Sequence, residues 1–555
     1  MYHVTRRQLV GGLASAPFLL RAGRAVAATA PIPARLAPAV AAIRDYAEQH
    51  RRFVGVPGLT LGLTAPDLPA AVVSVGTADR EGHPIGEDTL FQIGSISKLV
   101  TAALIHQLAS ERRLSLAADA RSLLPGAPWP AGPPITVQQL LDHRSGLPGN
   151  APIFPLDGPL WLGSTPGSHW TYSNTGYGLL GGIIERVEGQ PLARILDRRI
   201  FRPLGMGHSI GAILNANRAA YAQGFEPLER ERIFVPGDPL TPAPWVEVTF
   251  AAGSIASTAA DMVVLMRSLA DAAAGRGGLG LGPAAGKAFA AHMVAAEEDM
   301  RYGNGLMHVS DGQQPVLHHT GGMPSFSSSF HLDPATRTGA FASVPLGYPA
   351  GYRPRLLTMF AVQALRAAAA GRPLPAPAPL KSPYPKVDGL AGAYVADGDQ
   401  IAIMQSADGL AFRSGSSVGA LIPAGKDMFA TQTPGWTRWV FRFVRQSGQP
   451  VALEFGSKTF VRSGATFHPA ASNPALTPLA GRFVFDSPWG GIINICERGG
   501  KLWIDGAQPL TPIGDKLYRL GEEEWSPERV RFGEMVGGRP MAIFLSGERY
   551  ERRDV

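Results

Sequence analysis

Cysteine is almost absent from this sequence, because Cys496 is the single thiol among 555 residues. One cysteine excludes any internal disulfide framework, even in an oxidising compartment, so the folded chain must be stabilised by burial of apolar surface. Hydrophobic residues make up 45% of the chain and charged residues 17%, which is ordinary for globular proteins. A chain of this length is expected to form about two to four domains.

A membrane-spanning run is also missing. Arg6 and Arg7 precede an apolar run from Leu9 to Leu20, and Ala25-Val26-Ala27 has the small residues of a cleavage site. The run is shorter than the roughly 20 apolar residues that span a bilayer, and glycines interrupt it. We therefore expect residues 1–27 to be a cleaved export signal of the twin-arginine type, with retention as an anchor as the alternative. The mature protein would then be periplasmic or secreted, without a membrane span.

A strong charge of one sign is lacking as well. Removal of residues 1–27 would take away four arginines and no acidic residue, which lowers the formal net charge from +7 to +3. Nucleic-acid-binding domains carry a concentrated basic surface, so we expect no nucleic-acid partner. His, Cys and Glu residues do not cluster at metal-ligand spacings, and we expect neither a metal nor another cofactor.

Strand-like segments occur near both ends of the first 370 residues, and helical periodicity is typical of the part between them. This order predicts an α+β domain over residues 28–370, in which one antiparallel sheet flanked by helices is assembled from both ends and carries a mainly helical insert. The expected strands are 58–66, 70–79, 303–311, 315–322, 325–333 and 339–346, and the expected flanking helices are 34–53 and 353–371.

Proline and alanine dominate residues 371–387, which we expect to be a semi-rigid linker. Beyond it the sequence repeats with an offset of 89 residues, as in LAGAYVAD at Leu390 and LAGRFVFD at Leu479. Alternating apolar runs with glycine turns predict two duplicated small antiparallel β-barrel domains, with one continuous sandwich as the alternative. The expected barrels are 388–465 and 479–555, with a second linker at 466–478.

Lysine is scarce too, since only 8 of the 51 basic residues are lysines. One of them, Lys98, follows Ser95 by three positions in the stretch FQIGSISKLVTAAL, and no other Ser-x-x-Lys occurs. Positions i and i+3 share a helix face, so the amine can reach the hydroxyl. Serine needs a base beside it, and lysine, unlike arginine, loses its proton readily when desolvated. This predicts a nucleophile and its base, and an exposed lysine on an amphipathic helix is the alternative.

Two further stretches carry polar groups beside glycines or a helix start. Tyr172-Ser173-Asn174 precedes the apolar segment GYGLLGGII, and His319-Thr320-Gly321-Gly322 lies in an expected strand. Each has a plain structural explanation: the first as a helix N-cap with a packed aromatic ring, and the second as a bulge with a surface histidine. Their significance comes from their combination with Ser-x-x-Lys.

The three stretches together resemble the serine β-lactamase and penicillin-recognising hydrolase superfamily, in its class C β-lactamase-like, DD-peptidase and esterase branch. There, Ser-x-x-Lys, Tyr-x-Asn and Lys-Thr-Gly or His-x-Gly surround one cleft, and the resemblance covers about Ala34 to Ala370. It implies a Ser95 nucleophile, a Lys98 base, a Tyr172 proton relay, substrate binding by Asn174, His319 and Thr320, and an oxyanion hole from the N–H groups of Ser95 and Gly322.

The resemblance also bears on the substrate. Histidine at position 319 is only about a quarter protonated at pH 7 if its pKa is near 6.5, which weakens the fixed cation that lysine provides in β-lactamases. No family-like glutamate is assignable as a deacylation base, and no Gly-x-Ser-x-Gly elbow suggests an α/β-hydrolase. The weakened cation and the missing glutamate disfavour efficient β-lactam hydrolysis, whereas the missing elbow argues against an α/β-hydrolase triad.

The two barrels after the hydrolase resemble the architecture of bacterial D-aminopeptidase, in which a barrel loop narrows the active site. We therefore expect an acyl-enzyme serine hydrolase, a D-stereospecific aminopeptidase or amidase, acting on small molecules or short peptides. The alternatives are a carboxylesterase, a β-lactamase and a non-catalytic cell-wall-binding sensor, and homo-oligomerisation stays open. Phe485–Ile492 is the candidate capping loop, and a hairpin with Trp489 in the barrel core is the alternative.

Overall fold

The computed structural model describes residues 31–297, 299–312, 314–380, 387, 389–406 and 409–553. The expected signal peptide therefore lies outside the described residues. Within the described residues, no helix combines the length and apolar character needed to cross a membrane.

The first domain is built on one eight-stranded sheet in the order β2-β1-β12-β11-β10-β9-β8-β7, with every pairing antiparallel. Two strands come from the start of the domain and six from its end, which confirms the expected α+β sheet. The strands are β1 (Gly58–Ala65), β2 (Leu68–Gly76), β7 (Val294–Glu297), β8 (Met300–Gly303), β9 (Leu306–Ser310), β10 (Pro315–Gly322), β11 (Ser327–Asp333) and β12 (Thr338–Val344).

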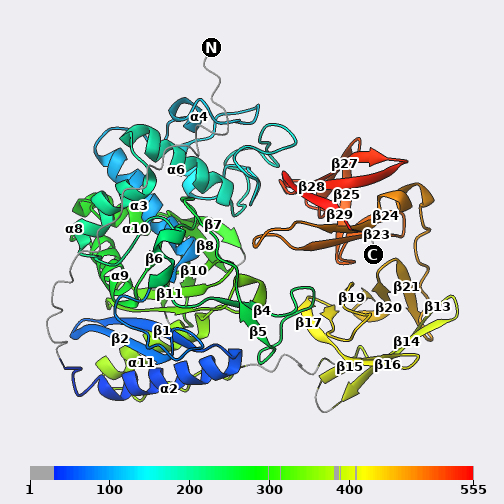
Figure 1. The fold of residues 1–555 in the computed structure, drawn as a ribbon, viewed down its shortest axis with the longest axis horizontal. Helices are drawn as coiled ribbons and strands as arrows, with labels where there is room; N and C mark the ends of the chain where they lie inside the picture. The colour runs from blue at the N-terminus through cyan, green and yellow to red at the C-terminus, as the bar shows by residue number, and fades with distance from the viewer. Residues whose placement is uncertain are drawn as a thin grey trace.

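Helices cover both faces of this sheet (Figure 1). Helix α2 (Ala37–Val54) and helix α11 (Arg355–Ala369) share one apolar cluster with β1 and β12. Helix α3 (Ser97–Ser110) and helix α9 (Ala259–Ala273) belong to the cluster on the other face. All eight residues of β1 are buried, because the strand is covered on both faces.

The insert between β2 and β7 is mainly helical, as expected. Local signals set its helices, as in α5, where Thr136 and Gln139 form a reciprocal capping box. The insert also carries two short two-stranded antiparallel sheets, β3 (Phe91–Gln92) with β6 (Ala256–Ser257) and β4 (Phe225–Pro227) with β5 (Leu240–Pro242). Its helices are α4 (Ala120–Leu123), α5 (Val137–Leu141), α6 (Asn174–Glu188), α7 (Leu192–Leu196) and α8 (Arg202–Leu204), and α10 (Pro283–Ala291) follows α9.

Two antiparallel β-barrels follow, which confirms the predicted duplication. The second is a closed barrel from β22 to β29, and the first is a nine-stranded sheet whose end strands, β16 and β17, are separated only by Leu421. The first sheet has one strand more than the second barrel. Its strands β16 and β17 together correspond to the single strand β25 of the second barrel, and Leu421 separates them. In both units the first and last strands pair, β13 with β21 and β22 with β29.

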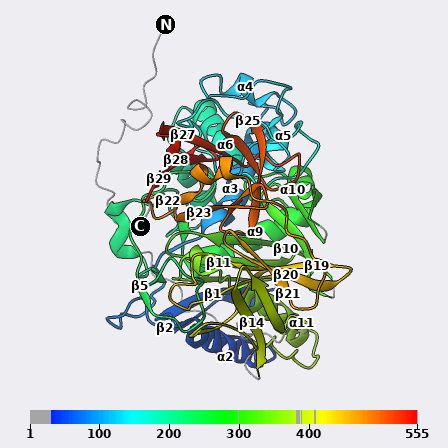
Figure 2. The ribbon, with the colours of Figure 1, turned by 90° about the vertical axis from the view of Figure 1, so that its right-hand side faces the viewer.

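The strands of the first unit are β13 (Gly392–Ala396), β14 (Asp399–Ser406), β15 (Gly409–Ser414), β16 (Ser417–Ala420), β17 (Ile422–Gly425), β18 (Met428–Ala430), β19 (Phe441–Gln446), β20 (Gln449–Phe455) and β21 (Lys458–Arg462). Those of the second are β22 (Gly481–Val484), β23 (Ile492–Arg498), β24 (Lys501–Ile504), β25 (Gln508–Gly514), β26 (Leu517–Leu520), β27 (Arg529–Val536), β28 (Arg539–Leu545) and β29 (Glu548–Arg552). Each barrel has its own apolar core. Both barrels lie on the same side of the first domain (Figures 1 and 2), and the second one contacts the loops that precede α6, at Gly149 and Trp161.

Candidate active site

Ser95 lies in a short 3-10 turn, Gly94–Ile96, that leads directly into helix α3. Ser95 itself is only partly buried, whereas its neighbours Gly94 and Ile96 are buried. One turn further on, Lys98 is completely buried, and its Nζ lies 3.2 Å from Ser95 Oγ. The helical spacing therefore brings the two groups together as the sequence predicts, and the alternative of an exposed lysine is wrong.

Two other oxygens contact the Lys98 amine. Its Nζ donates to Asn174 Oδ1 at 2.6 Å and to the carbonyl oxygen of Ala252 at 3.0 Å. Burial lowers the pKa of Lys98 well below its ordinary value. A neutral amine has two N–H groups and one lone pair. The two oxygen acceptors take the two N–H groups, so the lone pair is left for the Ser95 hydroxyl.

Tyr172 lies beside Ser95, whose side chain lowers the pKa of the tyrosine hydroxyl, although burial has the larger effect. Burial raises the pKa of this phenol, so it remains protonated at neutral pH and can donate a proton rather than act as a phenolate. Its ring lies 4.8 Å from Lys98 Nζ. Ser173 is the N-cap of α6, with its Oγ accepting from the N–H of Gly176 at 3.0 Å. The N-cap explanation thus holds for Ser173, while both of its neighbours contact Lys98.

Asn174 is held at both ends of its amide group. Its Oδ1 accepts from Lys98, and its Nδ2 donates to Asn150 Oδ1 at 2.6 Å. Its backbone N–H donates to the carbonyl oxygen of Gly149 at 2.7 Å. In this structure the side chain is therefore part of the network around the lysine.

His319 lies on β10 with a ring that is only 1% exposed. Its Nδ1 contacts the carbonyl oxygen of Thr320 at 2.6 Å, which makes Nδ1 the donor, and leaves Nε2 to accept from the hydroxyl of Tyr302 at 3.3 Å. Burial first, and then the Lys98 charge, lower the pKa of His319 to about 3. The ring is neutral at pH 7 and not partly protonated, a difference that follows from burial. The adjacent Thr320 is half-buried.

Glycines allow the end of β10 to approach the turn that carries Ser95. Gly94 has a φ of +54°, and a Cβ at this position would lie 2.7 Å from the backbone nitrogen of Gly322. A Cβ at Gly321 would lie 1.9 Å from the carbonyl oxygen of Ile93. The backbone of Gly322 therefore contacts the residue before Ser95, which is the proximity that an oxyanion hole requires.

Three buried residues that sequence reasoning missed complete the site. His143 accepts from the backbone N–H of Ser173 through Nδ1 at 3.0 Å, and its ring lies 4.3 Å from that of Tyr172. Tyr177 and Tyr302 pack on the other sides of His143, at 5.1 and 4.6 Å between ring centroids. The segment LLDHRSGLPG that contains His143 carries none of the three motifs from which the site is predicted. The Tyr177 ring also lies 5.4 Å from Lys98 Nζ, so these aromatic rings pack around both Tyr172 and the lysine.

The loop 485–491 of the second barrel reaches the same cleft from the side of Gly322. Tyr348 donates through its hydroxyl to the carbonyl oxygen of Trp489 at 3.1 Å, and the two rings stack with centroids 6.3 Å apart. A Cβ at Gly322 would lie 2.9 Å from the Cβ of Tyr348. Arg230 donates to the carbonyl oxygen of Pro488 at 3.2 Å. Trp489 is 41% exposed, so the alternative that places it in the barrel core is wrong.

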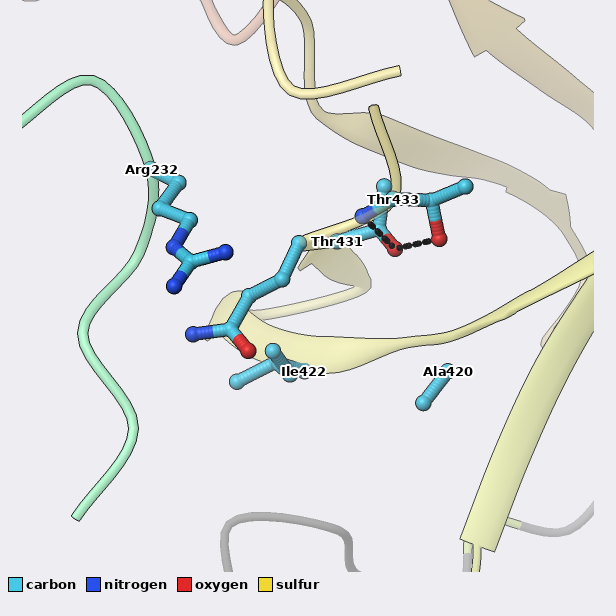
Figure 3. Close-up of a pocket in the computed structure, with 6 residues that line it drawn as sticks. Arg232, Ala420, Ile422, Thr431 and Thr433 are labelled. Carbon is cyan, nitrogen blue, oxygen red and sulfur yellow. Dashed lines mark hydrogen bonds between the residues drawn. The ribbon is translucent and has the colours of Figure 1, made fainter. Parts of the chain in front are cut away.

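Other polar features of the described residues lie apart from this cleft. Asp79, Glu81 and His83 bring potential metal-ligand atoms within 4.8 Å of one another, at the surface after β2. A polar cavity of about 300 Å³ opens where the first domain meets the first barrel (Figure 3). It is lined by Arg232, Ala420, Ile422, Thr431, Gln432 and Thr433, none of which contributes to the site around Ser95.

Comparisons with known proteins find relatives that match part of this chain. The esterase EstB of Burkholderia gladioli is 34% identical over 203 residues, covering 31% of this chain and 51% of that protein. The chain thus spans about half the length of the curated relatives it matches.

Two solved structures extend the likeness to the fold. A D-amino acid amidase from Ochrobactrum anthropi SV3, complexed with L-phenylalanine, has a TM-score of 0.51 and 25% identity, covering 61% of this chain and 100% of that one. An octameric penicillin-binding protein homologue from Pyrococcus abyssi has a TM-score of 0.53 and 21% identity, covering 76% of this chain and 100% of that one. The beta-lactamase family model matches residues 42–358, more than half of the sequence. The chain belongs to the beta-lactamase family.

Proposed function

We propose that this beta-lactamase-family hydrolase cleaves amide or peptide bonds through an acyl-enzyme at Ser95, with D-stereospecific amides of short substrates as its preferred class. The observation that carries the proposal is the fully buried Lys98, with its pKa lowered and its Nζ 3.2 Å from Ser95 Oγ. A neutral lysine at this distance is the base that a serine nucleophile needs.

Acylation begins when Ser95 Oγ attacks the substrate carbonyl carbon and its proton passes to Lys98. The carbonyl oxygen becomes negative and is held by the backbone N–H groups of Ser95 and Gly322, where the loss of one such donor typically costs about 3 kcal/mol. The C–N bond then breaks. The leaving nitrogen takes a proton from the hydroxyl of Tyr172, which Lys98 replenishes.

Deacylation reverses these roles. Water attacks the ester carbonyl, its proton passes to the Tyr172 and Lys98 pair, and Ser95 leaves with a proton. One water is consumed for each amide that is split into an acid and an amine. The raised pKa of the Tyr172 phenol supports its role as a neutral relay.

Two observations favour small amide substrates. His319 is neutral, so it offers no fixed positive charge to a substrate carboxylate. His319 and Thr320 both belong to β10, the strand along which we propose that the substrate binds. Trp489 and Tyr348 stack beside Gly322 and would limit the length of an acyl group. The likeness to the Ochrobactrum enzyme, a D-amino acid amidase, supports the stereochemical part of the proposal.

Carboxylesterase activity is the second candidate, because the curated relative EstB is an esterase by name and 34% identical. Amidase and carboxylesterase activity would proceed through the same kind of acyl-enzyme at Ser95, so only the rates on amide and ester substrates distinguish them. A non-catalytic cell-wall sensor is disfavoured, since such a protein has no need of a buried lysine beside the serine.

The test measures kcat/KM of the purified protein for D- and L-phenylalanine amide, p-nitrophenyl acetate and a chromogenic cephalosporin. We expect the D-amide to exceed the L-amide at least tenfold, the cephalosporin to be the poorest substrate, and Ser95→Ala to abolish all turnover. Turnover of the ester with neither amide would establish the carboxylesterase instead, and efficient cephalosporin hydrolysis would contradict both.

A further inference from the structure

A second loop of the second barrel, residues 521–528 between β26 and β27, docks next to the Tyr172–Asn174 segment. The Trp161 indole N–H donates to the carbonyl oxygen of Pro527 at 2.6 Å. A Cβ at Gly163 would lie 2.4 Å from the Cα of Pro527, so the two backbones are in close contact. This loop is distinct from the 485–491 loop and contacts the first domain beside Tyr172 and not beside Gly322.

Charge complementarity fixes the docking. Asp157 of the first domain has a side chain that is 1% exposed, and its Oδ2 lies 3.3 Å from Arg531 and 3.7 Å from Arg529, both on β27. The Arg529 guanidinium also lies 3.4 Å from the centroid of the Trp161 ring. Because the buried carboxylate of Asp157 pairs with two arginines of the barrel, the loop is held in one position against the first domain.

Glu528 begins a chain of hydrogen bonds that ends at the catalytic lysine. Its Oε1 accepts from the backbone N–H of Gly149 at 2.6 Å. The carbonyl oxygen of Gly149 accepts from the N–H of Asn174 at 2.7 Å. Asn174 Oδ1 in turn accepts from Lys98 Nζ at 2.6 Å. The N–H and C=O of Gly149 belong to different peptide groups, so this chain acts by fixing the position of Asn174 and does not depend on polarisation passing from bond to bond.

The barrel holds the other end of this carboxylate. Ser546, in the turn after β28, donates through Oγ to Glu528 Oε2. The carboxylate is therefore oriented from the barrel and directed at Gly149 in the first domain. Displacement of Gly149 would move Asn174, and the Lys98 amine would lose the acceptor that keeps its lone pair toward Ser95.

We propose that Glu528 is a positioning residue through which the second barrel holds Gly149, Asn174 and hence Lys98 in the geometry that activates Ser95. This inference rests on the proposed roles of Ser95 and Lys98. It makes the second barrel a part of the catalytic unit and not only a cap over the cleft.

The experiment uses the full-length chain as wild type, Glu528→Ala, Glu528→Gln and Glu524→Ala. Glutamine retains a carbonyl oxygen for the N–H of Gly149. Glu524 is exposed on the same loop, and its replacement is the matched control for the loss of a carboxylate. A fluorophosphonate probe gives both the fraction of protein that can be labelled at Ser95 and the rate at which each labelled site reacts. The values of kcat and KM for p-nitrophenyl acetate are measured in parallel.

We expect Glu528→Ala to lower the labelling rate and kcat about tenfold with KM changed less than twofold, while the labelled fraction stays near that of wild type. Glu528→Gln should recover most of the rate, and Glu524→Ala should match wild type. Equal rates in wild type and Glu528→Ala, or a reduced labelled fraction with an unchanged rate per site, would overturn the positioning role alone. Failure of wild type to label at Ser95 would overturn the proposed function and this inference together.

Discussion

The amine of Lys98 and the hydroxyl of Ser95 lie 3.2 Å apart, and the lysine has no exposed surface. The proximity follows from the i, i+3 spacing at the start of α3, and the burial follows from the packing of α6 and the Ala252 segment over that turn. Both conditions are required, because an exposed lysine at the same distance would remain charged at neutral pH.

The first prediction concerns the removable proton. Lys98→Arg keeps a positive charge but replaces a group that can deprotonate with one that cannot, so kcat/KM should fall by at least a hundredfold. Steady-state kinetics on an ester and an amide, with circular dichroism to verify the fold, measure the effect. Retention of more than about a tenth of wild-type activity corresponds to less than roughly 1.4 kcal/mol of barrier and would contradict the role of general base.

The pH profile tests the same group without mutation. Burial lowers the pKa of Lys98 and raises that of Tyr172. The neutral lysine is the active form, so activity should be lost as pH falls through the lowered pKa, and kcat/KM should be constant between pH 8 and 9. A lysine with its ordinary pKa of about 10.4 would instead give an almost tenfold rise across that unit. Such a rise would refute the neutral-lysine account.

Trp489 should act on substrate size. Its ring is stacked on Tyr348 beside Gly322 and is 41% exposed, so removal should widen the cleft with little loss of barrel stability. Trp489→Ala should raise the kcat/KM ratio of long to short acyl substrates at least fivefold, while fluorophosphonate labelling of Ser95 is retained. Val536→Ala, a similar truncation of an exposed apolar side chain on β27, is the control. An unchanged ratio together with a lower melting temperature would assign Trp489 a purely structural role.

Buried histidines predict acid sensitivity of the fold. Burial lowers the pKa of His318 to about 4, and its Nδ1 hydrogen-bonds to the carbonyl oxygen of Phe330. Because the unfolded chain binds this proton near pH 6.5 and the folded chain does not, stability is lost as pH falls from about 6.5 to 4.

One such group contributes roughly 2 to 3 kcal/mol of that loss by pH 4.5. His318→Asn keeps a donor for Phe330 but does not titrate. The difference in unfolding free energy between pH 7 and 4.5, measured with urea, should therefore be smaller in the variant. Identical pH dependence in the two proteins would show that His318 is not the group involved.

Local patterns were sufficient to predict much of the fold and the centre of the site. The spacing of Ser95 and Lys98 is a property of one helical turn, and the repeat at Leu390 and Leu479 depends only on similarity within the chain. The sheet assembled from both ends of the first domain followed from the order of strand-like segments. Each of these signals depends on residue spacing, on similarity or on the order of segments along the chain, and none requires knowledge of which residues pack together.

Features that depend on long-range packing could not be predicted in this way. The neutral state of His319 results from burial beneath Tyr302, which lies two strands away in the sheet. The docking of Glu528 on Gly149 joins residues 379 positions apart. No periodicity or motif reports such contacts, because they arise only when the barrel is placed against the first domain.

The most direct test of the central claim is the mass of the protein quenched during turnover of a D-amino acid amide or a p-nitrophenyl ester. The account predicts a species heavier by one acyl group, mapped by peptide mass spectrometry to Ser95, and absent from Ser95→Ala. Turnover with no acylated Ser95 under conditions that trap the intermediate, or an adduct on another residue, would contradict it.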